Sequence, residues 1–328
     1  MADTRFFEAI RDALHEEMAR DERVVVLGED VGRKGGVFGL TDGLLAAFGE
    51  ARVIDTPIAE AAIIGTSLGM AINGLIPVPE IQFADFIHPA FDQIVSEVAR
   101  LRYRSNNDFA CPMTIRVPYG GGVRGGLYHS QSIEAFYAHV PGLKVVVPYT
   151  PADAKGLLKA AIRDPDPVLY LEHKKMYRAV RGDVPRDGDH LVPIGPAVIR
   201  RPGRDLSIFA YGLMVHESLA AAAALAVEGI EAAVVDVRTL RPLDTRTILE
   251  SVARTNRALI VHEDNRFGGF GAEIAATIAE EGFRHLDAPP TRLCGPDVPG
   301  APFSRPLEDW FMINAEKIAA AARALTSW

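Results

Sequence analysis

Glu60 is an acidic residue whose setting could support proton chemistry. It stands in the first turn of a predicted helix, directly before the run 61–79, which contains no charged residue. A carboxylate in a first turn is favourable with the helix dipole, and that structural explanation stays open. Because the helix continues so apolar that it must be buried, Glu60 should lie at the edge of a core, where desolvation disfavours a charged carboxylate. A partly protonated carboxyl group there could donate a hydrogen bond to a ring nitrogen.

His129 is the second candidate. It lies outside any periodic apolar pattern and precedes Ser130, Gln131 and Ser132, which indicates a loop. An imidazole titrates near neutrality, so a loop histidine presented to a site can donate or accept a proton. A purely structural histidine is the alternative that the local sequence leaves open.

The glycine-dense segment before His129 satisfies a nucleotide-binding pattern. Residues 120–125 fit G-x-G-x-x-G and follow a predicted strand. A dinucleotide site would also need a helix starting at the last glycine and an acidic residue about 20 positions further on, and both are missing. We interpret the segment instead as a loop whose backbone approaches a ligand or another chain and delivers His129 to a site.

Residues 80–86 end a strand at the edge where open parallel sheets bind ligands. Phe83 and Phe86 in this segment are by default core residues. An aromatic side chain at a strand end can also stack on a planar ring.

The elements that position these residues alternate between strand and helix. Strands are predicted at 24–27, 53–54, 76–83, 113–117, 145–147 and 168–171. Helices are predicted at 7–18, 41–48, 58–73, 89–103 and 151–162. Run 61–79 is nearly long enough to span a bilayer, but its glycines and prolines favour a buried helix followed by a buried strand. This alternation implies a mostly parallel sheet covered on both faces.

A second domain follows a connecting segment. Residues 174–204 are charged and contain several prolines without a strong period, which is typical of an interdomain connection. Beyond it, strands at 206–211, 232–237 and 258–262 alternate with helices at 217–228, 244–255, after Gly271 and at 315–325. The predicted fold class is therefore α/β, with two three-layer domains at 1–175 and 205–328 and a linker at 176–204.

Composition excludes several kinds of partner. The 328 residues are 48% hydrophobic and 24% charged, which fits two globular domains. The formal net charge of -8 gives no sign of the clustered positive charge that binding to nucleic acid requires. Residues 1–17 carry charges throughout and show no apolar core of an export signal, so no membrane is expected. The cysteines are Cys111 and Cys294 alone, which favours a reducing compartment, the cytoplasm.

Several segments together resemble the beta subunits of thiamine-diphosphate-dependent 2-oxoacid dehydrogenases. Their order and spacing match along nearly the whole chain, at residues 27–31, 55–60, 80–86, 102–105, 128–132, 262–263 and 268–273. The resemblance implies a pyrimidine-binding domain of thiamine diphosphate enzymes, followed by a transketolase-like C-terminal domain. It also implies oxidative decarboxylation of a 2-oxoacid with acyl transfer to the lipoyl groups of an acyltransferase.

The resemblance assigns roles to single residues. Glu60 would hydrogen-bond the aminopyrimidine of the cofactor and promote its imino tautomer. Phe86 would stack on the pyrimidine, at a position where some relatives have tyrosine. Ile58, Ala59 and Gln82 would contact the cofactor.

The same resemblance extends to the substrate and to a cation. Glu29, Phe86, His88 and His129 would lie near the substrate, and His129 would handle the intermediate or the lipoyl group during acyl transfer. A potassium ion would be held largely by main-chain carbonyl groups around Met113, Ala161, Ile162, Asp164 and Asp166.

The magnesium half of such a cofactor site is missing from the chain. Enzymes of this kind bind the diphosphate through magnesium at a Gly-Asp-Gly segment, followed about 25–30 residues later by Asn-Asn, which supply hard oxygen ligands. Residues 182–183 and 187–189 have no asparagine pair downstream, and Asn106-Asn107 lies upstream of both. We therefore expect an alpha chain to bind most of the magnesium, in an assembly of two alpha and two beta chains that docks on a lipoyl acyltransferase.

Substrate preference is predicted from segments 83–86, 102–105 and 127–129, which resemble branched-chain more than pyruvate-specific subunits. We expect 2-oxoisovalerate to be preferred. The alternatives are a pyruvate or acetoin dehydrogenase beta subunit, a split transketolase or deoxyxylulose-phosphate-synthase relative, and a scaffolding subunit without catalysis.

Overall fold

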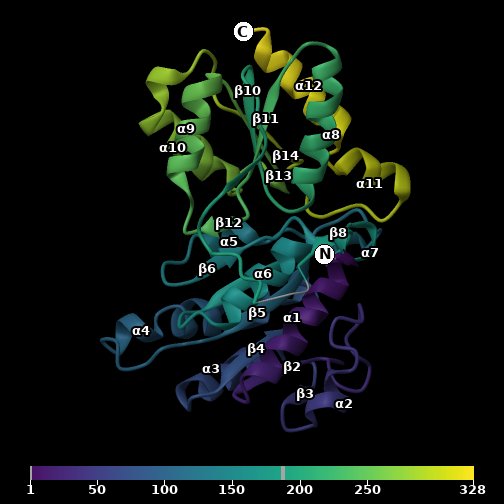
Figure 1. Cartoon of the computed structure of the whole chain (residues 1–328), viewed down its shortest axis with the longest axis vertical. Helices are drawn as coiled ribbons and strands as arrows, with labels where there is room; N and C mark the ends of the chain where they lie inside the picture. The colour runs from purple at the N-terminus through teal and green to yellow at the C-terminus, as the bar shows by residue number, and fades with distance from the viewer. Residues whose placement is uncertain (1, 186–188) are drawn as a thin grey trace. The chain divides into compact units, whose positions relative to one another are not determined.

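The computed structural model describes residues 2–185 and 189–328 (Figure 1). The chain forms two compact units. The first comprises the residues up to Tyr119 together with Phe136–Ile194, and the second comprises Gly120–Ala135 together with Gly195–Trp328. The domain limits expected at residues 175 and 205 stay a prediction of the sequence. Asp187 and Gly188, noted for a metal motif, lie outside the described residues.

The first unit contains the alternating elements that the sequence predicts. Its strands are β1 (Ala2–Arg5), β2 (Val24–Gly28), β3 (Val53–Asp55), β4 (Ile76–Glu80), β5 (Thr114–Tyr119), β6 (Lys144–Val146), β7 (Val168–His173) and β8 (Arg181–Val184). Its helices are α1 (Phe6–Arg20), α2 (Leu44–Phe48), α3 (Glu60–Ile72), α4 (Leu101–Arg104), α6 (Pro151–Ile162) and α7 (Met176–Ala179), and α5 (Glu134–Ala138) spans the limit between the two units.

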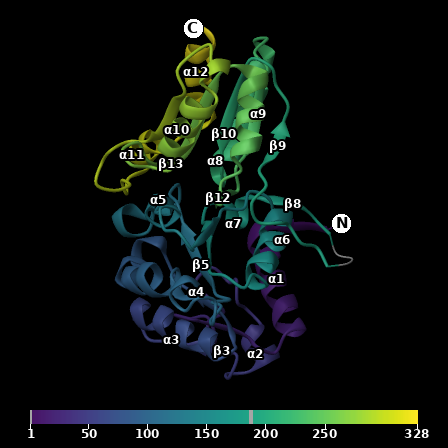
Figure 2. The ribbon, with the colours of Figure 1, turned by 90° about the vertical axis from the view of Figure 1, so that its left-hand side faces the viewer.

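The sheet of the first unit is parallel, in the order β6-β7-β5-β4-β2-β3. Strands β2, β4, β5 and β7 are buried along their whole length, because helices cover both faces. Figure 2 shows α1 and α6 on one side of this sheet and α3 on the other. Strand β1 pairs antiparallel with β8, away from the main sheet.

The helix predicted at 89–103 is interrupted. The structure has 3-10 turns at Ala84–Phe86 and His88–Ala90, then a π-helix at Gln93–Val98, and then α4. The amide of Ala99 donates to the carbonyl of Ile94, five residues earlier, at 3.0 Å. Apolar spacing reports which face is buried but not which carbonyl each amide reaches, so it cannot predict a π-helix.

The second unit has its own sheet, formed by β9 (Val198–Arg201), β10 (Leu206–Ala210), β11 (Ala232–Asp236), β13 (Ala258–Asn265) and β14 (Thr291–Gly295). The short strand β12 (Thr239–Arg241) is not part of this sheet. The helices of the second unit are α8 (Leu213–Val227), α9 (Thr245–Thr255), α10 (Gly271–Glu281), α11 (Arg305–Phe311) and α12 (Ala315–Thr326), with a 3-10 turn at Phe283–His285. The order β14-β13-β10-β11-β9 is parallel except for β9, which runs antiparallel to β11.

These elements confirm the predicted class, α/β with mostly parallel sheets and covering helices. The sequence predicted no regular element within 174–204, where the structure has α7, β8 and β9. These pieces are four residues long each, too short to produce a periodic pattern. Run 61–79 forms most of α3 and β4 as expected, and within the described chain no helix combines the length and apolarity needed to cross a membrane.

Candidate functional site

The carboxyl edge of the first sheet brings Glu29 and Glu60 into one region. Strand β2 ends at Gly28, and its register partner on β4 is Glu80. Gly28 has φ +153°, and a Cβ at this position would lie 2.6 Å from the carbonyl oxygen of Glu80, so only glycine allows this close approach. The amide of Thr56 donates to the carbonyl of Gly28 at 2.9 Å, which ties the segment before α3 to the end of β2.

Two carboxyl groups are buried here without a cation. Glu29 and Glu60 are each 9% exposed. Within the described residues, no hydrogen bond or ion pair reaches either carboxyl group. Burial raises the pKa of Glu29, and the negative charge of Glu60 raises it further. The pair can therefore accept hydrogen bonds from a ligand, and the raised pKa of Glu29 favours the protonated form of that side chain.

Glu80 lies at the same edge but is committed to an ion pair. Its Oε2 accepts from Nη1 of the fully buried Arg116 at 2.6 Å, and Nε of Arg116 donates to Glu172 at 2.7 Å. The hydroxyl of Tyr177 donates to Glu172 at 2.7 Å. This network ties β4, β5 and β7 together. It was not predicted, although an arginine within the otherwise apolar strand 114–119 was the available signal.

Aromatic rings stand at the end of β4. The rings of Phe83 and Phe86 meet edge to face with centroids 5.9 Å apart, and Phe38 packs on Phe83 at 5.6 Å. Phe86 is half-buried, and so is Gln82. His88 is exposed, with its ring 5.5 Å from that of Phe136. Phe86 is thus partly exposed at the end of the strand, where an aromatic side chain can stack on a planar ligand.

The segment before α3 exposes an apolar side chain. Ile58 is 81% exposed, although it stands two residues from the buried Glu60, and Ala59 between them is half-buried. The hydroxyl oxygen of Thr56 is buried and has no hydrogen-bond partner in the described part of the chain. The exposed side chain of Ile58 and the half-buried ring of Phe86 offer apolar surface, and Glu29 and Glu60 offer buried carboxyl groups. Together they suit a planar ligand with polar ring atoms.

His129 belongs to the second unit. It follows a 3-10 turn at Gly126–Tyr128 and is half-buried. A pocket of about 460 Å³ adjoins it, lined by residues 125–129 and 300–303. A Cβ on Gly125 would lie 2.6 Å from the carbonyl oxygen of His129, so glycine is needed at this position. The structure therefore presents His129 from a glycine-dependent loop, as the sequence predicted.

Buried ionisable groups lie behind this loop in the second unit. Glu134 is fully buried, and the hydroxyl of Tyr211 donates to it at 2.8 Å. Burial raises the pKa of Glu134 to about 8, and the charge of Asp264 contributes. Burial also raises the pKa of Asp264 to about 6 and lowers that of His262 to about 4. The sequence analysis did not identify these groups as linked, because their partners are distant along the chain.

The residues proposed to bind potassium converge at the opposite, amino edge of the first sheet. The carbonyl of Met113 accepts from the amide of Val168 at 2.9 Å, and that of Ala161 accepts from the amide of Asp164 at 3.1 Å. Lys144 donates to the carboxylate of Asp164 at 2.6 Å. Arg102 donates to Asp166 at 2.5 Å. These side chains are already neutralised, so a cation would have to rely on main-chain carbonyl groups such as that of Ile162.

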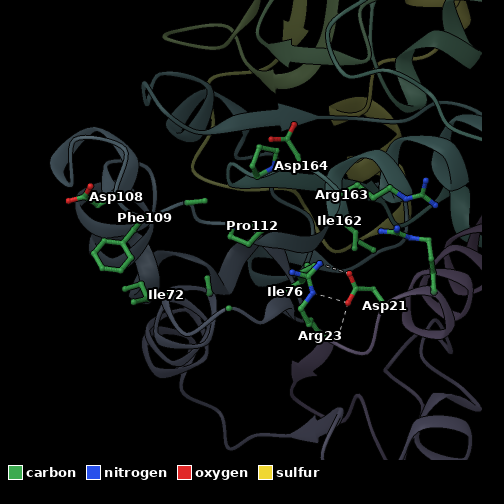
Figure 3. A pocket seen from close by; sticks show the side chains of 15 residues that line it. Asp21, Arg23, Ile72, Ile76, Asp108, Phe109, Pro112, Ile162, Arg163 and Asp164 are labelled. Atoms are coloured by element: carbon green, nitrogen blue, oxygen red, sulfur yellow. Dashed lines mark hydrogen bonds and ion pairs between the residues drawn. The ribbon is translucent and has the colours of Figure 1, made fainter.

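A larger pocket, of about 540 Å³, lies at this amino edge and is shown in Figure 3. Its lining includes Ile162, Asp164 and the ion pair between Asp21 and Arg23, whose atoms are 2.7 Å apart. It contains neither Glu60 nor the aromatic residues after β4. The larger pocket therefore does not coincide with the site that the sequence predicts in this unit. In the described residues, no group of three or more His, Cys, Asp or Glu side chains is arranged to hold a metal ion.

The comparisons with known proteins agree with this geometry. Residues 3–180 match the family model "Transketolase, pyrimidine binding domain", and residues 195–318 match "Transketolase, C-terminal domain". The chain is 54% identical to the 2-oxoisovalerate dehydrogenase subunit beta of Bacillus subtilis (strain 168), over 98% of each chain. It is 47% identical to the pyruvate dehydrogenase E1 component subunit beta of the same bacterium, over 99% of each.

A plant relative and a solved structure extend the comparison. The chain is 47% identical to the mitochondrial 2-oxoisovalerate dehydrogenase subunit beta 2 of Arabidopsis thaliana, over 98% of this chain and 89% of the relative. A solved split gene transketolase, described as an inactive beta4 tetramer, superimposes with a TM-score of 0.78 at 26% identity and covers 99% of both chains.

Proposed function

Because the chain belongs to the family of 2-oxoacid dehydrogenase beta subunits, we propose that it forms the pyrimidine half of a thiamine diphosphate site and, with an alpha subunit, oxidatively decarboxylates a branched-chain 2-oxoacid. One observation carries this proposal. Glu60 is a buried carboxyl group at the carboxyl edge of the sheet, and within the described residues it has no partner of its own.

The residues present fit the aminopyrimidine of the cofactor. When bound, thiamine diphosphate supplies the electron sink for decarboxylation. Glu60 would hold and move a proton at a pyrimidine nitrogen, and Phe86 would pack against the ring. Ile58, Ala59 and Gln82 would line the rest of the contact. Glu29, whose pKa is raised by burial and by Glu60, would sit near the substrate as a proton-holding neighbour, together with the exposed His88.

His129 would act in the transfer of the acyl group. Histidine is the most common general acid or base in enzymes, and the pocket that adjoins His129 is lined mainly by glycine and apolar residues. Such a lining suits an uncharged acyl or dithiolane group. We therefore propose that His129 donates or accepts the proton at the reaction intermediate or at the lipoyl sulfur.

Two cations are proposed. Magnesium would bind the diphosphate mainly through the alpha chain, since this sequence lacks the Gly-Asp-Gly and Asn-Asn combination. Potassium would bind to main-chain carbonyls around Met113, Ala161, Ile162, Asp164 and Asp166, where each carbonyl oxygen that accepts one amide keeps a second lone pair.

The proposed assembly contains two alpha and two beta chains and docks on a lipoyl acyltransferase. The support for this assembly is the missing magnesium segment, because a second type of chain must then complete the cofactor site. A cytoplasmic location is proposed because Cys111 and Cys294 are free thiols, as is usual in reducing compartments. A preference for 2-oxoisovalerate is supported by the 54% identity to a 2-oxoisovalerate dehydrogenase subunit, against 47% for the pyruvate dehydrogenase subunit.

Reconstitution with the alpha subunit tests the proposal. We expect no thiamine-diphosphate-dependent activity from this chain alone, and activity with magnesium once the alpha chain is added. The value of kcat/KM should favour 2-oxoisovalerate over pyruvate by about tenfold, because each buried methylene contributes roughly 1 kcal/mol. A fully active homodimer would contradict the half-site assignment. A clear preference for pyruvate would contradict only the substrate assignment.

A further inference from the structure

The loop that presents His129 has a backbone that needs support from outside. Gly120, Gly122 and Gly126 have φ values of +85°, +78° and +66°, and Arg124, which carries a side chain, has φ +58°. A residue with a Cβ rarely adopts a left-handed conformation, which persists only where its surroundings fix it. Contacts from other segments must therefore hold this loop.

A carboxylate from α11 provides one such contact. Glu308 is 4% exposed. Its Oε1 accepts from the amide of Gly122 at 3.1 Å and from the amide of Arg124 at 2.8 Å. Hydrogen bonds from backbone amides to an ionised acceptor are stronger than neutral ones, especially when buried. Glu308 thus holds the residue with the least favourable backbone conformation in the loop.

A second carboxylate, from the end of β13, holds the preceding residue. Oε1 of Glu263 accepts from the amide of Gly121 at 2.5 Å, and Glu263 is 6% exposed. A Cβ on Gly121 would lie 2.9 Å from the sulfur of Met312, the residue that follows α11, so this side chain packs closely on the loop. Two elements distant along the chain therefore converge on the loop through carboxylates.

Glu308 differs from its neighbours on α11. Leu307 and Trp310 are each 56% exposed, and Asp309 pairs with Arg305 in solvent. Glu308 instead points into the unit, and within the described residues its side chain makes no ion pair. The polar contacts of its carboxylate there are the two loop amides. A buried carboxylate without a cation is costly, and the two hydrogen bonds from the loop amides offset part of that cost.

We propose that Glu308 is a positioning residue for His129. It fixes the tip of the loop and thereby the place from which the imidazole reaches the transferred group. The inference rests on the role in acyl transfer that is proposed above for His129. It adds a residue from α11, a helix without any group in the cofactor half of the site.

The test is a double-mutant cycle in the enzyme reconstituted with its alpha subunit. The single variants are Glu308→Gln, Glu308→Leu and His129→Ala, and the double variant combines the last two. Asp309→Asn serves as the exposed control on the same helix. The readouts are kcat and KM for reductive acylation of a lipoyl domain, with thermal melting as the check on assembly.

We expect Glu308→Gln to remain within about threefold of the unmodified enzyme, because its amide oxygen still accepts both amides. Glu308→Leu should lower kcat about tenfold or more with a smaller change in KM. In the His129→Ala background, Glu308→Leu should change kcat less than about twofold, because residues that act through one another are not additive. If the leucine variant fails to assemble, Glu308→Asp replaces it, with an intermediate loss expected.

Equal losses from Glu308→Leu with and without His129 would overturn the proposal while leaving His129 in its role. A glutamine variant as impaired as the leucine variant would overturn the account based on the loop amides. Unchanged acylation in His129→Ala would instead overturn the role of His129, and the positioning role with it.

Discussion

Glu80 has a positively charged partner, and in the described residues Glu29 and Glu60 do not. Glu80 is paired with the buried Arg116 at 2.6 Å, whereas no cation reaches the other two carboxyl groups in the described residues. Burying a carboxylate without a partner is unfavourable, so such groups persist where a ligand completes them. This contrast at one sheet edge supports the proposed binding site for a nitrogen heterocycle.

The role of His129 leads to a prediction about two half-reactions. His129→Ala should impair reductive acylation of the lipoyl domain at least as much as decarboxylation measured with an artificial electron acceptor. We expect a loss on the order of 10²-fold, the usual contribution of a positioned acid or base. Steady-state rates of both assays on the reconstituted enzyme check this. If both rates are unchanged, the histidine is structural.

Single residues of the proposed site could be named from the sequence where their own segment carried the signal. Glu60 was identified because an uncharged run follows it, and His129 because glycines precede it. Glu308 was not identified as part of the site, because its partner Gly122 is 186 positions away. Contacts over such separations depend on the tertiary fold, and local patterns do not report them.

At the scale of elements, the buried acids of the second unit make its stability depend on pH. Glu134 has a folded-state pKa of about 8 against an ordinary value of 4.5. The folded chain therefore keeps a proton that the unfolded chain loses, and stability falls as pH rises from about 4.5 to about 8. His262, with a pKa lowered from 6.5 to about 4, acts in the opposite sense, and its contribution is lost as pH falls through that range.

We therefore predict that Glu134→Gln stabilises the chain at alkaline pH. The amide cannot ionise, and its oxygen can still accept from the hydroxyl of Tyr211. Its melting temperature should exceed that of the unmodified chain by about 2 °C or more at pH 8.5, with a smaller difference at pH 5. Glu316→Gln, at an exposed position on α12, is the matched control. Equal shifts at both pH values would show that ionisation of Glu134 is not the cause.

Elements were predictable where start signals and burial agreed. Helix α6 was predicted at its observed limits, 151–162. In the structure, Thr150 caps it by accepting from the amide of Asp153 at 3.0 Å, and Pro151 suits its first turn. The single helix predicted at 89–103 was wrong, because the π-helix at Gln93–Val98 leaves the apolar pattern nearly intact. Short strands such as β9 gave no period to detect.

At the scale of the whole molecule, the chain matches two family domains, and we propose that it supplies only part of a catalytic centre. Both family models match, at residues 3–180 and 195–318. The magnesium segment is missing from the sequence between and within them. Activity is therefore expected to be a property of the assembly with the alpha chain, in which Glu60 contributes the proton chemistry at the pyrimidine.

The most direct test of this account is turnover in the reconstituted enzyme that carries Glu60→Gln, with the exposed Glu50→Gln as its control. The amide keeps the size of the side chain but cannot exchange a proton with the pyrimidine. The account predicts that the variant assembles with the alpha chain at the normal melting temperature and loses decarboxylation by about 10²-fold or more, whereas the control is unaffected. Near-normal turnover in the Glu60→Gln enzyme would contradict it.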